Sequence, residues 1–399
     1  MKTFTVKSPD DNTGKTGSGQ LELFAPNPML TEDLFRAYYE ARRNKRNTHN
    51  ALQFELDLEH NIIQLSREIA ERTYSLSKSI CFIVDKPVKR EIFAAHFRDR
   101  VVHHYLISKL MPIIENQLIY DTYACRKGKG TLFGMKRLGK FMRKCSNNFT
   151  TSAYILKLDI RGFFMNIKKT LLNEKVQALI RKKYHEEDKE ILCYLSKTII
   201  LNSPEHNCII KGSKQNWEGL PDSKSMFKTP ADCGLPIGNL TSQVFANLYL
   251  SDLDYFVKRE LKCKYYGRYV DDFFIVHRQK EALLKFVRDI SLFLKERYAL
   301  VLHPQKIYLQ SVSKGISFLG GVIKPYRSYV GHRVKKNLFC ALENNRFLNV
   351  SEQERRQELE AILNSYYGFS VHHRTCRLFE KVIDRMPLVW GQLRCKVLE

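Results

Sequence analysis

Two adjacent aspartates, Asp271 and Asp272, stand between two apolar runs and constrain the fold more than any other feature of the chain. The runs, 264–269 and 273–277, are rich in aromatic and β-branched residues, which favour strands. Asp is depleted in strands, and two neighbouring like charges repel unless a cation or water screens them. The pattern therefore predicts a β-hairpin with acids at its tip. For this pair alone, a solvated turn without chemistry remains the alternative.

A third carboxylate, Asp159, ends the apolar run 154–160, which is typical of a buried strand. Three carboxylates on neighbouring strand ends form an all-oxygen site that suits Mg²⁺. Two such ions, roughly 3.5–4 Å apart, stabilise the attacking and leaving oxygens of an in-line phosphoryl displacement. We therefore expect Asp159, Asp271 and Asp272 to be catalytic and to bind two Mg²⁺ ions, which Mn²⁺ can replace.

The net charge supports this chemistry, because 66 Lys and Arg residues face 42 Asp and Glu residues, giving a formal charge of +24. Such an excess favours a polyanionic partner, although an anionic membrane surface attracts the same charge. The chain has neither an apolar run of membrane-spanning length nor an N-terminal signal-peptide pattern. Its ten cysteines stand singly, without a CxxC pair, which argues against a zinc ribbon. We expect a cytoplasmic protein with no membrane partner.

The hydrophobic pattern and the turn residues predict a chain of alternating helices and short strands. A strand is expected at 80–84, a basic glycine-bearing loop at 123–131, and an extended loop at 203–230. The helices are expected at 31–47 with Thr31 as N-cap, 58–72, 98–117 with an interruption at Pro112, 170–200, 241–261 and 280–298. At 399 residues, the chain is long enough for two or three packed subdomains.

The segments around the acids resemble the motifs of reverse transcriptases. Tyr269–Asp272 resembles their YxDD box, and Leu158–Phe164 resembles the acidic motif before it. The other segments are similar to the motif between those two, to the fingers motifs of bacterial reverse transcriptases, and to the primer grip. In the order of the family, the six segments are Phe97–His104, Tyr123–Gly130, Leu158–Phe164, Gly234–Gln243, Tyr269–Asp272 and Phe318–Gly321.

One departure from the common pattern indicates a subfamily. Most reverse transcriptases have Gln before the central glycine of the third motif, followed by Ser-Pro, whereas this chain has Ile237 and Ser242-Gln243. That form, with a long 208–233 insertion carrying Trp217, is similar to diversity-generating retroelement reverse transcriptases. Ile offers only apolar contact to an incoming nucleotide, and weaker positioning lowers discrimination between bases. The resemblance implies error-prone copying opposite template adenines.

The resemblance also implies roles for single residues. Ile160 would give a backbone carbonyl to the metal, and Lys306 matches a lysine proposed to protonate pyrophosphate. The residues expected at the nucleotide are Lys86, Arg90, Arg161, Gly162, Phe163, Phe164, Ile237 and Gly238. The residues expected at nucleic acid are Arg126, Lys127, Lys129, Gln243, Phe318, Leu319 and Gly320. The alternatives are a solvated basic turn for Lys86 and Arg90, and core packing for Phe164.

The implied fold is α+β, a right-hand polymerase with a small antiparallel palm sheet and a helical thumb. The expected parts are an N-terminal extension with helices (1–74), fingers (75–150), palm with the first acidic motif (151–168), fingers with an inserted loop (169–236), palm with the YVDD hairpin and primer grip (237–325) and thumb (326–399).

The resemblance further implies the partners: an RNA template, a DNA or RNA primer, dNTPs and a small basic helical-bundle accessory protein. The expected function is RNA-directed DNA polymerase activity making error-prone cDNA in a diversity-generating retroelement. One alternative is another bacterial reverse transcriptase, serving phage defence or derived from a group II intron. A second is a non-catalytic basic RNA-binding scaffold, which should lack at least one acid.

Overall fold

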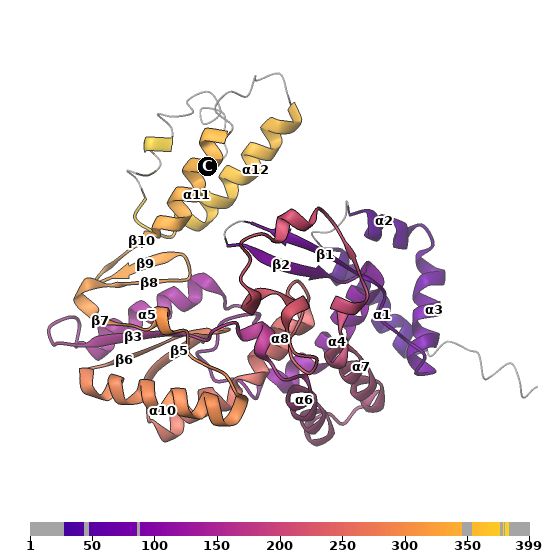
Figure 1. The fold of residues 1–399 in the computed structure, drawn as a ribbon, viewed down its shortest axis with the longest axis horizontal. Helices are drawn as coiled ribbons and strands as arrows, with labels where there is room; N and C mark the ends of the chain where they lie inside the picture. The colour runs from indigo at the N-terminus through magenta and orange to yellow at the C-terminus, as the bar shows by residue number, and fades with distance from the viewer. Residues whose placement is uncertain are drawn as a thin grey trace, which may run out of the picture.

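The computed structural model describes residues 28–43, 48–85, 88–344, 353–375, 378 and 380–382. Three small sheets are surrounded by helices (Figure 1). The helices are α1 Pro28–Arg42, α2 His49–Glu55, α3 Leu58–Ala70, α4 Phe97–Glu115, α5 Thr131–Cys145, α6 Lys169–Lys183, α7 Lys189–Leu201, α8 Leu240–Tyr249, α9 Ser251–Tyr255, α10 Lys280–Tyr298, α11 His332–Asn344 and α12 Gln353–Ser370. The strands are β1 Ser79–Val84, β2 Arg90–Ala94, β3 Tyr154–Asp159, β4 Cys208–Ile210, β5 Tyr265–Tyr269, β6 Asp272–His277, β7 Tyr308–Ser311, β8 Ile316–Phe318, β9 Gly321–Lys324 and β10 Arg327–Val330.

A four-stranded antiparallel sheet in the order β5-β6-β3-β7 carries the three aspartates. Its β5–β6 hairpin is the one that the Asp pair predicts, and Asp159 lies directly opposite Asp272 on the neighbouring strand. In Figure 1 helix α10 runs along one side of this sheet, and the β8–β10 sheet lies on the other. The strands therefore meet apolar neighbours on both faces.

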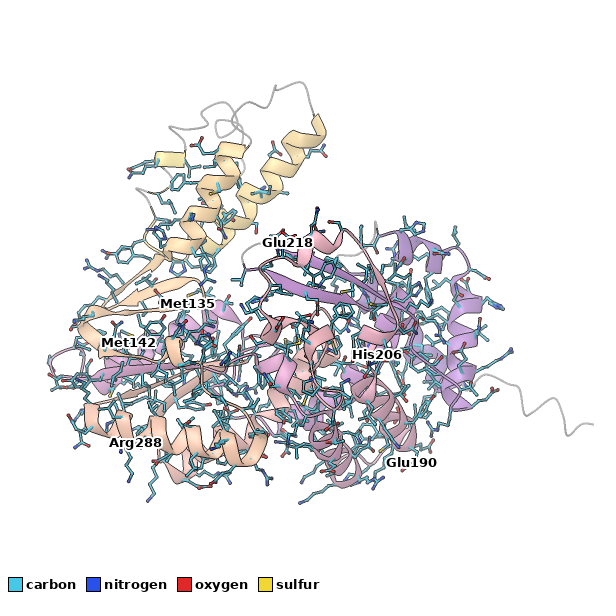
Figure 2. The ribbon with its side chains drawn as sticks, in the orientation of Figure 1. Met135, Met142, Glu190, His206, Glu218 and Arg288 are labelled. Carbon is cyan, nitrogen blue, oxygen red and sulfur yellow. The ribbon has the colours of Figure 1, made fainter. Side chains whose placement is uncertain are left out.

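Both faces of the sheet are buried, which explains why its strands are continuous apolar runs rather than alternating ones. Phe273 and Ile275 of β6 face a large core shared with α4 and α8. Phe274 and Val276, which point the other way, face a second core with α5. Met135 and Met142 lie on the buried face of α5 and pack in that second core (Figure 2).

A second sheet, in the order β2-β1-β4, ties the inserted segment to the strands at 79–94. The carboxylate of Glu91 on β2 is fully buried and accepts three hydrogen bonds from the insertion. Their donors are Trp217 Nε1 at 2.7 Å, Ser225 Oγ at 2.9 Å and the Met226 amide at 2.5 Å. Lys89 reaches the carbonyl of Glu218, which Figure 2 labels beside these strands. The expected extended loop at 203–230 is thus a series of 3₁₀ turns and one strand, held by a buried acid.

Three local predictions were wrong. Helix α1 begins at Pro28 and not after Thr31, because proline fits the first turn, where its missing N–H would have had no helical acceptor. Helix α4 continues through Pro112 to Glu115, because its flanking residues Leu110 and Ile114 are buried and hold it in place. Strand β10 lies in the segment after 326 that was expected to be helical, where it pairs with β9.

Helices α11 and α12 pack against each other beyond the β8–β10 sheet, at the other end of the molecule from α1–α3 (Figure 1). Their shared core contains Leu338, Leu342 and Leu363. The expected division of the chain into fingers, palm and thumb stays a prediction. Among the described residues, none of the helices has the length and apolar character needed to cross a membrane.

A buried ion pair joins the hairpin to the helices behind it. Arg268 of β5 and Asp254 of α9 are both fully buried, and two guanidinium nitrogens reach the carboxylate at 2.7 and 2.5 Å. Tyr266 and Thr122 also donate to this carboxylate, at 2.6 and 3.3 Å. Arg268 in turn donates to the Asn247 carbonyl at 3.1 Å. Every charge is therefore satisfied, as burial in a low-dielectric core requires.

Replacing Asp254 by Ala should destabilise the protein by about 3–5 kcal/mol, because Arg268 is left buried without a counter-charge. Urea denaturation followed by circular dichroism measures the change. The double variant Asp254→Ala/Arg268→Met should recover part of the stability, since the unpaired charge is gone. The exposed control Glu296→Ala should stay within about 0.5 kcal/mol of the unchanged protein. Equal destabilisation of the single and double variants would contradict the ion-pair explanation.

Candidate active site

The tip of the β5–β6 hairpin is a strained two-residue turn. Val270 takes a φ of 57°, a left-handed conformation that a β-branched residue adopts only under constraint. The Arg268 guanidinium donates to the Val270 carbonyl at 3.0 Å. The same arginine that binds Asp254 thus holds the turn that presents Asp271. Strain of this kind costs about 1–3 kcal/mol and persists only where the surroundings enforce it.

The three carboxylates come together by strand register. Asp159 ends β3 opposite Asp272, the first residue of β6. Beyond the last strand pair, the Ile160 amide donates to the Asp271 carbonyl at 3.3 Å, and the His303 amide donates to the Asp159 carbonyl at 2.7 Å. Like charges directly opposite each other on neighbouring strands are destabilising. The fold therefore maintains an arrangement that electrostatics alone opposes.

Two lysines partly neutralise this charge. Lys157, two residues before Asp159 on the same side of β3, reaches Asp272 at 3.1 Å. Lys306 lies 2.9 Å from Asp159. The structure thus brings the expected Lys306 into the site, and adds Lys157, which the sequence motifs do not indicate.

Asp271 and Asp272 hold their protons more tightly than ordinary aspartates. Burial raises the pKa of Asp271 to about 7, and the charges of Asp159 and Asp272 contribute to this rise. Burial also raises the pKa of Asp272, to about 6, against the lowering effect of Lys157. The Oδ1 atom of Asp272 is buried with no hydrogen-bond partner among the described residues. Burial therefore disfavours the ionised forms of these two acids, and a bound cation would favour them.

Oxygen donors with uncompensated negative charge fit a hard divalent cation such as Mg²⁺. The residues that could hold one are Asp159, Asp271 and Asp272, with the backbone carbonyl of Ile160. Within the described ranges, however, no group of three or more His, Cys, Asp or Glu side chains is arranged to hold a metal ion. In this structure Asp159 and Asp272 direct oxygens towards Lys306 and Lys157 instead.

Beside the acids, four residues expected at the nucleotide form one wall: Gly162, Phe164, Ile237 and Gly238. Arg161 is exposed, and Phe164 is partly buried against the small core of Cys81, Phe93, Met165 and Met226. Ile237 packs on that same core, and its carbonyl accepts from the Phe93 amide at 2.9 Å.

Two glycines of this wall are required by close contacts. Gly238 has a φ of +124°, and a Cβ there would lie 2.9 Å from Ile92. Gly162 has a φ of +57°, and a Cβ there would lie 2.8 Å from the Ser223 carbonyl of the insertion. The inserted segment thus lies directly over the turn that follows Asp159.

The strongest comparison with known proteins is a family model described as reverse transcriptase (RNA-dependent DNA polymerase), which matches residues 86–323. This match covers more than half of the chain and includes all three aspartates. The chain belongs to the reverse transcriptase family. The expected α+β reverse-transcriptase fold is confirmed, and RNA-directed DNA polymerase is the enzyme class of that family. Among curated proteins, none matches the chain.

Solved telomerase structures show a weak likeness to this reverse transcriptase. Apo telomerase from Candida Tropicalis, truncated from its C-terminal domain, aligns with a TM-score of 0.45 and 14% identity, over 67% of this chain and 59% of that chain. Telomerase from Candida albicans, in complex with a TWJ fragment of telomeric RNA, aligns with a TM-score of 0.42 and 12% identity, over 80% and 60%. The chain spans about three fifths of the length of these structures. The family assignment rests on the sequence match.

Some reverse-transcriptase residues expected at ligands have side chains that face the core. Phe163 is buried and packs towards Tyr249. Phe318 is buried against Phe274 in the second core. Arg126 donates to the Glu115 carboxylate and to two backbone carbonyls, which leaves its guanidinium inside the fold. The sequence motifs indicated the positions of these residues in the chain but not the direction of their side chains.

The other expected contacts lie on accessible parts of the reverse transcriptase. Lys127 is exposed, and Lys129 lies over the Tyr120 ring while donating to the Tyr120 carbonyl at 2.5 Å. Gln243 accepts from Cys125 at 2.9 Å, beside the same loop. Leu319 and Gly320 form the β8–β9 turn with positive φ. Arg90 is exposed on β2, and Lys86 lies outside the described residues.

Sequence reasoning missed Arg268, Asp254 and Glu91, which are fully buried and hold the segments around the site. One signal was available, because a charged Arg268 within an apolar strand implies a buried partner. Nothing local indicates which of the 42 acids provides it.

The raised pKa of Asp271 predicts a pH dependence of stability. Its folded-state pKa of about 7 exceeds the ordinary value of 3.8, so the folded state binds more protons between these values. The free energy of unfolding should therefore fall as pH rises through this range, and the fall should be smaller for the Asp271→Asn variant. Urea denaturation in EDTA at about pH 5 and about pH 8 measures the difference.

Adding Mg²⁺ at the higher pH should stabilise the unchanged protein more than the Asn variant, because a cation bound only by the folded state shifts the equilibrium. Parallel pH curves for the two proteins, with no selective effect of Mg²⁺, would contradict the assignment of Asp271.

Proposed function

We propose that this protein synthesises DNA on an RNA template by metal-assisted nucleotidyl transfer. The observation that carries the proposal is the register of β3 and β6, which places Asp159 opposite Asp272 beside the strained Asp271 turn, within the matched family region. The substrates would be an RNA template, a DNA or RNA primer, and dNTPs. A non-catalytic RNA-binding scaffold is disfavoured, because selection for binding alone does not require three clustered carboxylates.

Asp159, Asp271, Asp272 and the Ile160 carbonyl would hold two Mg²⁺ ions, or Mn²⁺ in their place. Bound there, the ions would act as Lewis acids on the primer 3′-hydroxyl and the triphosphate.

The chain itself supplies position and charge. Arg161 and Arg90 are exposed cations near the wall formed by Phe164 and Ile237, where they can bind phosphate oxygens. Lys306 has a side chain 47% exposed beside Asp159, within reach of a departing pyrophosphate that needs a proton.

Asp271→Asn should abolish primer extension on an RNA template with Mg²⁺, because the amide removes a negative charge and a ligand from the acid cluster. Incorporation of labelled dNTP into a DNA primer measures the activity. Asp289→Asn on α10, the same change outside the acid cluster, should retain full activity. Undiminished synthesis by Asp271→Asn would overturn the site assignment.

We further propose that the enzyme makes error-prone cDNA in a diversity-generating retroelement, and that it acts with a small basic helical-bundle accessory protein. Two observations support this subfamily. Ile237 occupies the position where most relatives carry Gln, and it packs on an apolar core rather than presenting a polar group. The insertion is packed into the fold, because Trp217, Ser225 and Met226 donate hydrogen bonds to the buried Glu91. Another bacterial reverse transcriptase, serving phage defence or derived from a group II intron, is the alternative.

Ile237→Gln should lower the error rate roughly two- to tenfold, the worth of one hydrogen bond to the nucleotide. Sequencing of the cDNA, with errors sorted by template base, measures the effect. Ile237→Val keeps the apolar contact and should copy as inaccurately as the unchanged enzyme. The subfamily proposal fails if errors opposite adenine are no commoner than errors opposite the other bases.

The proposed parts follow the family's right-hand plan. The β5-β6-β3-β7 sheet would be the palm, the β2-β1-β4 sheet with its neighbouring helices the fingers, and α11 with α12 the thumb. The proposed location, the cytoplasm, rests on the isolated cysteines, of which the described ones are free thiols.

A further inference from the structure

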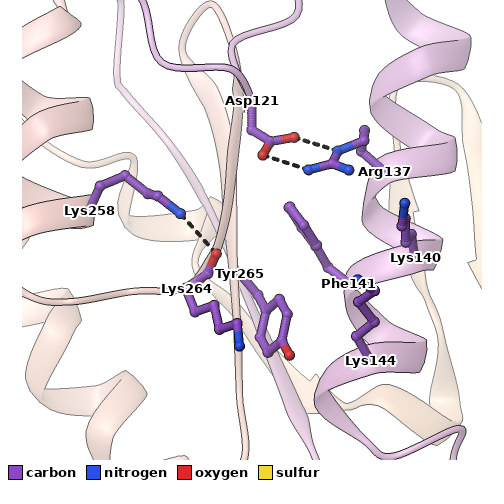
Figure 3. A pocket seen from close by; sticks show the side chains of 8 residues that line it. All are labelled: Asp121, Arg137, Lys140, Phe141, Lys144, Lys258, Lys264 and Tyr265. Carbon is purple, nitrogen blue, oxygen red and sulfur yellow. Dashed lines mark hydrogen bonds and ion pairs between the residues drawn. The ribbon is translucent and has the colours of Figure 1, made fainter.

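A basic cavity of about 500 Å³ lies along the β5 edge of the four-stranded sheet, away from the wall of Ile237 and Phe164. It is formed by three separate parts of the chain: the face of α5, the segment 258–265 and the residue Asp121 (Figure 3). Its lining residues are Asp121, Arg137, Lys140, Phe141, Lys144, Lys258, Lys264 and Tyr265. Five of these eight side chains are cations and one is an acid.

The single acid that lines the cavity already accepts hydrogen bonds from its neighbours. Asp121 binds Arg137 through two bonds of 2.6 and 2.8 Å, and it also accepts from the Tyr123 hydroxyl at 3.1 Å. Lys140, Lys144 and Lys264 are exposed and have no acidic partner among the described residues. The cavity therefore has several uncompensated positive charges around a hollow surface.

Helix α5 concentrates this charge at a cost to its own stability. It carries five basic residues and no acidic one in 15 residues. Arg137, Lys140 and Lys144 follow one another at spacings of three and four, which places them on one helix face. Like charges at these spacings destabilise a helix by about 0.2–0.5 kcal/mol per pair. A bound polyanion would remove this repulsion.

The register of β5 and β6 places the cavity and the acids at opposite ends of β5. Tyr265 pairs with Val276, whereas Tyr269 at the other end of β5 pairs with Asp272. Four residues of strand correspond to about 13 Å. Phe141 and Tyr265 line the cavity with ring centroids 5.5 Å apart, so it also offers apolar surface beside its cations. The cavity is therefore a second surface, not an extension of the acid cluster.

A second basic cavity extends the basic surface beyond the first one. It has a volume of about 430 Å³, and its lining includes Lys324, Arg327 and Arg374 with no acid. Tyr326, which also lines it, donates to the carbonyl of Asn148, three residues after the end of α5. The second cavity thus lies beside the loop that follows α5, the helix whose face lines the first cavity. A chain of phosphates matches this arrangement better than one small anion.

We propose that the cavity at Lys140, Lys144 and Lys264 binds the phosphate backbone of RNA outside the copying site. The contacts would be independent of sequence, because lysines bind phosphates and do not read bases. Such a surface would hold a folded part of a template RNA while another part is copied. The inference goes beyond the proposed reaction, and binding can be measured without nucleotides or catalysis.

The test measures binding of a fluorescein-labelled RNA hairpin with a blunt double-stranded stem, by anisotropy in EDTA over a range of KCl concentrations. The triple variant Lys140→Ala/Lys144→Ala/Lys264→Ala should bind about tenfold or more weakly. The slope of log affinity against log salt should also fall in magnitude by about 2–3, close to one for each lysine–phosphate pair that the variant cannot form. A charge-preserving variant with Arg at all three positions should bind like the unchanged protein.

The matched control removes three exposed lysines from another surface, as Lys182→Ala/Lys183→Ala/Lys197→Ala on α6 and α7. It should change affinity and slope far less. Equal effects of the two triple variants would overturn the proposal, since total charge would then explain binding. No effect of the cavity variant would also overturn it and would favour an acidic protein partner. Inorganic phosphate could also remove the difference in affinity between the unchanged protein and the cavity variant. If KCl of equal ionic strength does not remove it, the cavity is a small-phosphate site and not an RNA site.

Discussion

The ion pair between Arg268 and Asp254 is the interaction on which the arrangement of the acids depends. Both side chains are fully buried, so neither charge can be screened by water. Arg268 connects three things at once: the Asp254 carboxylate of α9, the Asn247 carbonyl of α8 and the Val270 carbonyl in the hairpin turn. The turn is thereby attached to the helices behind the sheet.

This attachment explains how unfavourable features persist at the tip. Val270 is in a left-handed conformation, and Asp159 faces Asp272 across the strands. Both features oppose folding. Burial, with a smaller contribution from the charge of Asp159, raises the pKa values of Asp271 and Asp272. Lys157 and Lys306 offset some of the charge. A cluster that is costly without a cation is well suited to bind one, because binding relieves the repulsion.

The inserted segment follows a similar principle on the other side of the site. Glu91 is a buried acid whose charge is satisfied by three donors from the insertion. This anchoring places Met226 in the core on which Phe164 and Ile237 pack, and places Ser223 over Gly162. The shape of the wall next to the acids therefore depends on a segment more than 40 residues further along the chain than Gly162.

The amino-acid sequence by itself determined the local features. The hairpin at 264–277, the strand that ends at Asp159 and the helix at 280–298 follow from residue types and periodicity, which act over a few neighbours. The order of the six motifs determined the family, and the match over 86–323 confirms it. Sequence position did not show that Phe163, Phe318 and Arg126 point into the fold, because a motif specifies place in the chain and not side-chain direction.

Only the tertiary structure decided which charges meet. The partners Arg268 and Asp254 are 14 residues apart, Glu91 and Trp217 are 126 apart, and Lys306 and Asp159 are 147 apart. Such pairs form because packing of the sheets and helices brings distant segments together, and no local pattern encodes that distance. The basic cavity beside α5 has the same origin, since its cations come from two separate segments that meet only across the edge of β5. The sequence thus determined the three acids, and the packing decided what surrounds them.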